Sequence, residues 1–214
     1  MPLHTSDALI LRTYALGESD RIVVFLTRDR GKKRGVAKNA RQSRRRFGGA
    51  LEPLTCGRIT YRERERRDLV FVQEMAPTRS PLTAADGEAL GYVGYFAELI
   101  DECSPENDPG EPMFRLGTSV VEAIAAGVGI ESLARYFEFW LLRLQGVYRD
   151  DPALSAGARR FLSAARSCPP SALGNVPVSP AVLRELERVH QLQIVMHLEK
   201  DLKSTKVLRE IRRT

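Results

Sequence analysis

Cationic side chains are concentrated in one stretch of this 214-residue chain, between Arg28 and Arg46. Ten of the nineteen residues in that stretch are lysine or arginine, and Asp29 is the only acidic one. Guanidinium and ammonium groups neutralise phosphates and release counterions, which gives affinity for nucleic acid without reading its base sequence. The stretch, called the basic run below, therefore predicts a surface that binds a polyanion.

Three other interpretations of the basic run are weaker. A solvated surface that only aids solubility usually mixes charges of both signs. A disordered basic tail is normally terminal, whereas this run is internal and includes or adjoins Val36, Ala37 and Phe47, which can anchor it to a core. Binding to an anionic membrane would require an amphipathic apolar face, and none accompanies the run. No membrane partner is therefore expected.

Motifs that would indicate an enzyme are absent from the sequence. There is no phosphate-binding G-x-x-x-x-G-K-[ST] or G-x-G-x-x-G loop, and no G-x-S-x-G frames a nucleophile. His190 and His197 have no third ligand nearby, so core or surface histidines are expected rather than a metal site. The acidic residues of 100–111 are expected to form a solvated linker. We predict no enzyme activity, catalytic residue or cofactor; a nuclease using scattered acids and a metal is the alternative within that class.

Charge is distributed unevenly along the chain. Residues 1–80 contain 18 Lys/Arg against 9 Asp/Glu, whereas residues 81–214 contain 15 against 18. This asymmetry predicts a basic domain over 1–80 joined to a near-neutral domain over 81–214. Apolar runs are far shorter than the roughly 20 residues that span a bilayer, and the first residues do not read as a secretory signal. The expected location is therefore the cytoplasm.

The elements that must position the basic run are short β-strands. Strand-favouring residues alternate with turn residues, and Gly57 suggests a bulge or tight bend. Five short strands in about 75 residues favour a small closed barrel, because closure removes exposed edges. A barrel of the OB type would present the run on one face and in its connecting loops. The predicted strands cover 7–14, 20–28, 34–38, 51–63 and 68–74.

The second half of the chain has a helical period. One predicted helix places Leu90, Val93, Ala97 and Ile100 on a single apolar face, and Ser179 is expected to cap a later helix. The fold class is thus α+β with two domains, an OB-fold barrel followed by an α-helical bundle. The predicted helices fall within 86–103, 113–127, 130–146, 157–166 and 179–202, and a basic segment, 203–214, follows them.

The sequence resembles the bacterial RecO family of DNA repair and recombination-mediator proteins. The resemblance is sharpest over 8–54, which includes Gly17-Glu18-Ser19-Asp20 and Ala37-Lys38. It continues more weakly through YFAELIDE (95–102), FEFWLLRLQG (137–146) and HLEKDLKSTKVL (197–208), so it covers nearly the whole chain.

The resemblance implies a non-enzymatic activity in DNA repair and recombination, with a nucleoid-associated location. It implies binding to single- and double-stranded DNA, annealing of complementary strands, and help for RecA in replacing single-strand-binding protein (SSB). The implied protein partners are RecR and the SSB C-terminal tail, with RecA an indirect one. An OB-fold protein that binds RNA or the ribosome through the same basic loop is the alternative function.

The DNA-binding residues expected from the basic run and the resemblance share a positive charge within 28–46. The first half of the run is expected to lie on the barrel's binding face, and QSRRRFGG (42–49) to form a mobile loop that adds affinity without geometry. The SSB tail is acidic and hydrophobic, so it needs a cation beside an apolar pocket. The expected DNA-binding residues are Arg28, Lys32, Lys33, Arg34, Lys38, Arg41, Arg44, Arg45 and Arg46. The possible tail-binding cations are Arg135, Arg143, Lys203 and Lys206.

Two departures from the family pattern have structural consequences. Asn39 stands where many members have a glycine, and asparagine is the residue other than glycine that best tolerates a left-handed backbone. Many members also have a four-cysteine zinc site in the helical domain, whereas this chain has only Cys168 in that region. Cys56, Cys103 and Cys168 are scattered, so neither a disulfide framework nor a zinc finger is expected.

Overall fold

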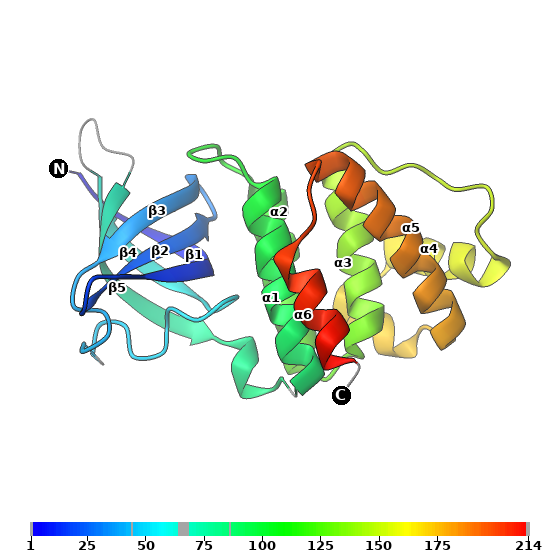
Figure 1. Ribbon diagram of the computed structural model, residues 1–214, viewed down its shortest axis with the longest axis horizontal. Coiled ribbons are helices and arrows are strands. Elements are labelled where there is room, and N and C mark those ends of the chain that lie inside the picture. Colours follow the sequence, from blue (N-terminus) through cyan, green and yellow to red (C-terminus); the bar gives the residue numbers. More distant parts are fainter. Residues whose placement is uncertain (1, 44, 64–68, 86, 213–214) are drawn as a thin grey trace.

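A computed structural model describes residues 2–43, 45–63, 69–85 and 87–212. Arg44, one of the expected DNA-binding residues, lies outside these ranges. The chain forms a β-barrel at one end and a group of helices at the other (Figure 1). None of the helices in the described ranges has the length and apolarity that crossing a membrane requires.

The barrel is closed, with strand order β1-β2-β3-β5-β4 and β4 pairing back onto β1. All neighbours are antiparallel except β3 and β5, which are parallel. The predicted class, an OB-fold barrel followed by helices, is confirmed. The strands are β1 (Leu3–Leu16), β2 (Asp20–Thr27), β3 (Gly31–Ala37), β4 (Cys56–Arg62) and β5 (Leu69–Arg79).

Two strand boundaries differ from the prediction by five residues, the largest differences among the strands. The segment 51–55 is a turn and not the start of β4, because Leu54 adopts a left-handed φ of 57° and its side chain is fully buried. β5 continues to Arg79, five residues beyond the predicted end, since it pairs with β4 up to Cys56. The bulge expected at Gly57 is present as a register shift between Cys56 and Gly57.

The barrel has apolar residues on both faces of β1 and β2, which explains why these strands read as nearly continuous apolar runs. Ile10 and Phe25 point into the barrel, whereas Leu9, Val24 and Leu26 pack against the helices. Successive side chains of a strand point to opposite faces, so this division follows from alternation. The helices therefore cover one side of the barrel and leave the rest for function.

Each of the predicted helices is present, and the basic segment after them adds a further one. Ser179 caps α5, with its Oγ accepting a hydrogen bond from the Val182 amide at 3.4 Å, as predicted. Two short 3-10 segments, Pro81–Thr83 and Pro170–Asn175, lie between longer elements. The helices are α1 (Gly87–Cys103), α2 (Glu111–Ala125), α3 (Ile130–Leu144), α4 (Ala156–Ser167), α5 (Pro180–Leu198) and α6 (Lys203–Ile211).

One predicted core position is wrong. Leu90 is 45% exposed, whereas Val93, Ala97 and Ile100 are buried as expected. The reason is that α6 packs on α1 at Gly91, where an added Cβ would collide with the side chain of Leu208. The closest packing on this turn of α1 is therefore at Gly91, and Leu90 beside it stays in solvent.

Candidate nucleic-acid interface

The first half of the basic run, in the hairpin of β2 and β3, is paired with carboxylates. Arg28 is 2.9 Å from Glu111, and Arg34 is 2.9 Å from Glu106. Lys33 donates a hydrogen bond to Glu63 at 2.8 Å, which lowers the pKa of that glutamate below its ordinary value. Three of these expected DNA-binding residues therefore already have an acidic partner.

Lys32 is buried between the barrel and the helices. Its side chain bonds the carboxylate of Asp101 at 3.0 Å and also donates to the Asp101 carbonyl, while Arg12 of β1 bonds the same carboxylate. Lys32 is 8% exposed and Asp101 is 4% exposed. The expectation of a solvated linker over 100–111 is wrong at Asp101, because two cations of the barrel fix it. Because its side chain is buried, Lys32 is not accessible to a phosphate in this structure.

After β3 the run continues into a turn that is held against the β1–β2 turn. Asn39 has a φ of 54°, and its amide donates to the Asp20 carboxylate at 2.8 Å. The Arg41 amide donates to the Ser19 carbonyl at 3.1 Å, and its guanidinium donates to the Glu18 carbonyl at 3.1 Å. Asparagine thus accommodates the left-handed backbone of this turn.

Hydrogen bonds connect the described residues of the following loop to one another and to the barrel. Arg46 donates to the Ser43 hydroxyl at 3.0 Å and to the Lys38 carbonyl at 2.9 Å. Phe47 is buried in the barrel core at 2% exposure, and the Met75 amide donates to the Arg46 carbonyl. The anchoring role expected for Ala37 and Phe47 is confirmed, since both belong to the barrel core.

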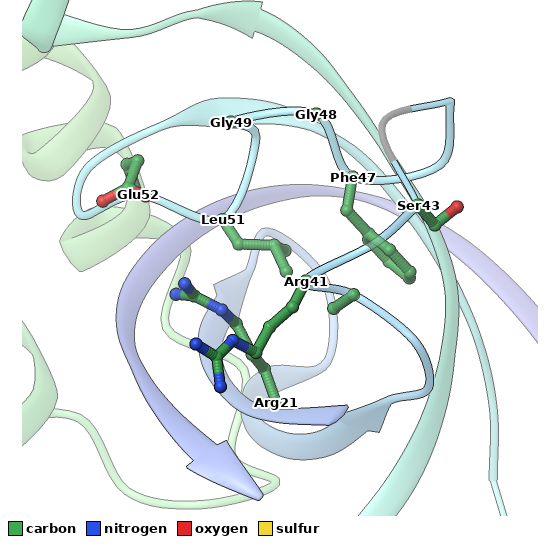
Figure 2. Close-up of a pocket in the computed structure, with 9 residues that line it drawn as sticks. Arg21, Arg41, Ser43, Phe47, Gly48, Gly49, Leu51 and Glu52 are labelled. Carbon is green, nitrogen blue, oxygen red and sulfur yellow. The ribbon is translucent and has the colours of Figure 1, made fainter. Parts of the chain in front are cut away.

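A pocket of about 420 Å³ lies between this loop and β2. Arg21 and Arg41 line it together with Phe47 and Leu51, and Figure 2 shows the two guanidinium groups on the same side of it. Arg21 pairs with Ala37 across β2 and β3, which places it beside Lys38. Arg21 could not be predicted as part of this surface, because it lies seven residues before the run and only the register of β2 on β3 brings it there.

These cations form one surface, which we call the basic face. None of the basic-face residues has a carboxylate within ion-pair distance among the residues that the structure describes, although Glu52 also lines the pocket. Unpaired cations remain available to an external anion. The basic face consists of Arg21 and Arg41, which line the pocket, Lys38 and Arg46, which a hydrogen bond joins, and Arg45, the exposed neighbour of Arg46 in the chain.

Aromatic side chains contribute little to the exposed surface of the barrel. Phe25, Phe47 and Tyr61 are at most 2% exposed, so their rings are not available to stack on bases. Tyr14 is 45% exposed, with the Arg12 guanidinium over its ring. The basic face therefore has the chemistry of a phosphate-binding surface rather than a base-stacking one.

A second pocket, of about 480 Å³, lies where α2 and α3 meet the 3-10 segment Pro170–Asn175. Its lining is largely apolar and includes Leu116, Tyr136, Trp140 and Leu144. Leu144 is 40% exposed at the pocket. We call this the tail pocket.

Cations flank the tail pocket. Arg115 lines it, and the Arg143 guanidinium lies 5.8 Å from the Trp140 ring. Arg143 was an expected tail-binding cation, whereas Arg115 was missed because no local motif marks it. Arg135 is instead buried at 2% exposure beside Glu138. Lys203 and Lys206 lie on α6 and are not among the residues that line this pocket.

Metal-binding chemistry is not assembled in the described part of the chain. No three of its His, Cys, Asp and Glu side chains are grouped so as to hold an ion. The three cysteines are free, and burial raises the pKa of the Cys56 and Cys103 thiols to about 12. His190 is buried against Glu138 at 3.1 Å, as a core histidine.

Comparison with known proteins finds family models that match both the barrel and the helical part of the chain. The family model "Recombination protein O N terminal" matches residues 1–81, and "Recombination protein O C terminal" matches residues 84–150. DNA repair protein RecO of Koribacter versatilis is 42% identical over 149 residues, which cover 69% of this chain and 61% of the relative. RecO of Anaeromyxobacter sp. (strain Fw109-5) is 36% identical over 186 residues, covering 81% and 72%.

RecO of Geobacter metallireducens is 37% identical over 141 residues, which cover 66% of this chain and 57% of the relative. The chain spans about three fifths of the length of the first curated relatives it matches. The closed barrel, the helices that follow it and these matches agree. The chain is therefore a member of the RecO family of DNA repair proteins.

Proposed function

We propose that this chain is a non-enzymatic DNA-binding protein of repair and recombination. It binds single- and double-stranded DNA, anneals complementary strands and helps RecA to load onto SSB-coated DNA, with RecR as a further partner. The observation that supports this best is the basic face, an unpaired cationic surface on the OB barrel of a RecO-family chain. The cations act by neutralising phosphates, which lowers the repulsion between two strands that come together.

Binding through the basic face should depend strongly on salt and little on base sequence. If four to five of its side chains contact phosphate, log K should fall with log salt with a slope of about −4 on duplex DNA. Single strands should give a slope closer to −3. The scarcity of exposed aromatics disfavours the alternative, an RNA-binding protein that stacks unpaired bases.

The experiment that tests this function is annealing of SSB-coated complementary DNA strands, followed by fluorescence energy transfer between labels on the two strands. We expect this protein to accelerate annealing at low salt and to lose that effect as salt rises. A matched pair of RNA strands is the comparison. No acceleration on DNA, with tighter binding to RNA, would contradict the proposal and favour the alternative.

The tail pocket supplies the chemistry that an acidic, hydrophobic SSB tail requires. Trp140 and Leu144 offer apolar surface, and Arg115 and Arg143 place positive charge at its edge. Apolar side chains of a peptide would pack against Trp140 and Leu144. Its carboxylates would lie near Arg115 and Arg143. The tail pocket is thus the proposed partner site on the helices.

Trp140 is the only tryptophan of the chain, so its fluorescence reports on the tail pocket. We expect a synthetic peptide of acidic residues with an apolar end to change this fluorescence on binding. Arg115→Ala with Arg143→Ala should weaken the peptide's affinity about tenfold, because each exposed charge contributes somewhat under 1 kcal/mol. Lys203→Ala with Lys206→Ala is the control and should leave it unchanged; weakening by the control pair alone would place the site on α6 instead.

A further inference from the structure

An acidic segment that runs from the last turn of α1 to the first residue of α2 lies against the β2–β3 hairpin of the basic run. Asp101 bonds Lys32, Glu106 pairs with Arg34 at 2.9 Å, and Glu111 pairs with Arg28 at 2.9 Å. We call these three acidic residues the acidic clasp. Each of them pairs with a cation of the β2–β3 hairpin. The clasp therefore contacts the basic run specifically, and not the barrel surface in general.

Backbone contacts, in addition to the side-chain pairs, hold the acidic segment against the hairpin. The Asn107 amide donates to the Lys32 carbonyl at 2.9 Å, and Lys32 and Glu106 form an isolated parallel β-bridge. Gly31 has a φ of 70°, and a Cβ there would collide with the backbone of Asp108. The hairpin thus accommodates the acidic segment through a glycine that permits both the turn and the close approach.

The clasp has a buried part and an exposed part. Asp101 is 4% exposed and holds Lys32 and Arg12, so it keeps the segment attached to the barrel. Glu106 and Glu111 have side chains 40% and 52% exposed, and their arginine partners are more than half exposed. Exposed ion pairs contribute little to stability and are screened by salt, so another anion can replace them.

The exposed part of the clasp covers cations next to the basic face. Arg34 and Lys38 belong to one face of β3 and its continuation, because side chains two residues apart share a face. They are four positions apart, with Lys38 directly after the end of β3, which corresponds to about 13 Å along an extended chain. A nucleic acid lying on the basic face and continuing along β3 would therefore meet Arg34 and then Arg28, where Glu106 and Glu111 now lie.

We infer that Glu106 and Glu111 are an intramolecular competitor of nucleic acid for Arg34 and Arg28. In the free protein they occupy these arginines, so a strand that extends from the basic face along β3 contacts Arg34 and Arg28 only to the extent that its phosphates displace the two carboxylates. This inference rests on the proposed function, since it concerns how the same DNA-binding surface is regulated. It predicts that the chain binds with fewer phosphate contacts, and so more weakly, than its basic run would allow.

The test is Glu106→Gln with Glu111→Gln, measured as duplex DNA binding across a range of salt. Gln keeps the size of each side chain, and both sites are exposed, so the fold should be retained. Two released arginines should steepen the salt slope by up to about 1.8 and raise affinity at 0.1 M salt about tenfold or more. Glu122→Gln with Glu131→Gln is the matched control, because it removes the same charge from pairs with Arg79 and Arg212, outside the run.

Arg34→Ala, introduced separately into the wild type and into the Glu106→Gln, Glu111→Gln variant, tests directly whether the released arginine contacts DNA. In the wild-type background it should leave the salt slope nearly unchanged, whereas in the Gln variant it should remove about 0.9 of the gain. An unchanged slope in the Gln variant, or an equal change in the charge control, overturns the inference while leaving the proposed function intact. No DNA binding by either the wild type or the Gln variant overturns the proposed function itself.

Discussion

Replacing Lys38, Arg41 and Arg45 together by alanine is expected to weaken duplex DNA binding by two to three orders of magnitude at about 0.1 M salt. Each phosphate contact contributes about 0.9 to the salt slope, so the slope should flatten by up to about 2.7. The three side chains are exposed and have no carboxylate partner among the described residues. Their loss should therefore remove affinity without a large loss of stability.

Fluorescence anisotropy of a labelled duplex at several salt concentrations measures both quantities. Arg160→Ala, Arg184→Ala and Arg188→Ala together form the charge-matched control, because these exposed arginines lie on α4 and α5, away from the barrel. The control should change the slope by much less than one unit. If both triple variants flatten the slope equally, binding depends on net charge and the basic face is not the site.

The barrel could be predicted from the sequence because its determinants are local. Alternation of apolar residues, turn residues between strands and the bulge at Gly57 are each visible within a few positions. The left-handed turn at Asn39 follows from a residue-type preference as well. Local chemistry thus fixes the strands, and closure of the barrel follows from the need to pair their edges.

The division of the basic run could not be predicted, because it depends on partners far away in the chain. Lys32 and Asp101 are 69 residues apart, and nothing near either residue shows that they meet. The acidic residues of 100–111 have the same composition whether they form a solvated linker or pair with the β2–β3 hairpin, so composition cannot distinguish the two. In the β2–β3 hairpin the run has acidic partners at Arg28, Lys32, Lys33 and Arg34, whereas none is found among the described residues for the cations that follow it, Lys38, Arg41, Arg45 and Arg46.

The basic face and the tail pocket also depend on contacts between residues far apart in the sequence, so they could not be predicted either. Arg21 joins the basic face only through the register of β2 on β3, and Arg115 meets Trp140 only through the packing of α2 on α3. Helical periodicity assigns Trp140 and Leu144 to an apolar face. It does not show that the 3-10 segment Pro170–Asn175 leaves part of that face open.

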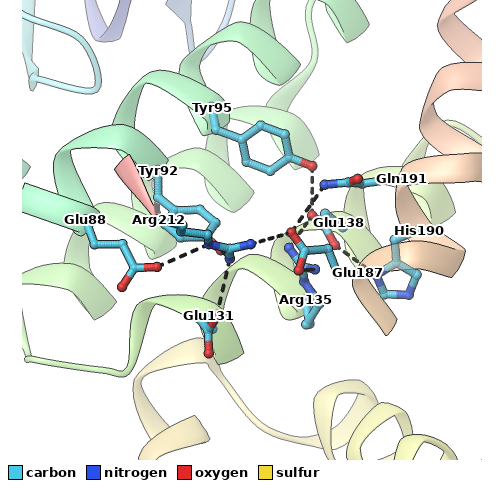
Figure 3. Close-up of polar contacts among 10 residues, drawn as sticks. All are labelled: Glu88, Tyr92, Tyr95, Glu131, Arg135, Glu138, Glu187, His190, Gln191 and Arg212. Carbon is cyan, nitrogen blue, oxygen red and sulfur yellow. Dashed lines mark hydrogen bonds and ion pairs between the residues drawn. The ribbon is translucent and has the colours of Figure 1, made fainter. Parts of the chain in front are cut away.

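Helix α3 also carries a buried polar cluster that joins it to α1 and α5 (Figure 3). Glu138 is fully buried and accepts hydrogen bonds from Tyr95 at 2.7 Å and from Arg135 at 2.8 Å. Its other oxygen lies 3.1 Å from His190 Nδ1. Burial, with the Glu138 carboxylate beside it, raises the pKa of Tyr95 well above its ordinary value, so the phenol stays protonated and donates.

Glu138→Ala is therefore expected to be the most destabilising single substitution proposed for this chain. It would leave Arg135, at 2% exposure, with only the more distant Glu187 at 3.5 Å. Removing one partner of a buried ion pair costs about 3–5 kcal/mol, because the remaining charge is desolvated without compensation. Urea unfolding followed by circular dichroism should show this decrease in the free energy of unfolding.

Glu131→Ala is the matched control on the same helix, because its carboxylate is 43% exposed and pairs with Arg212 at 3.3 Å. It should cost less than about 1 kcal/mol. The barrel contacts the helices through the acidic clasp, the apolar outer face of β1 and β2 and the Arg79–Glu122 pair, and none of these contacts includes Glu138. Folded Glu138→Ala protein should therefore keep the wild-type salt slope for DNA, because the basic face lies on the barrel. A loss of DNA binding without a loss of stability would instead mean that the helices contribute directly to the DNA-binding surface.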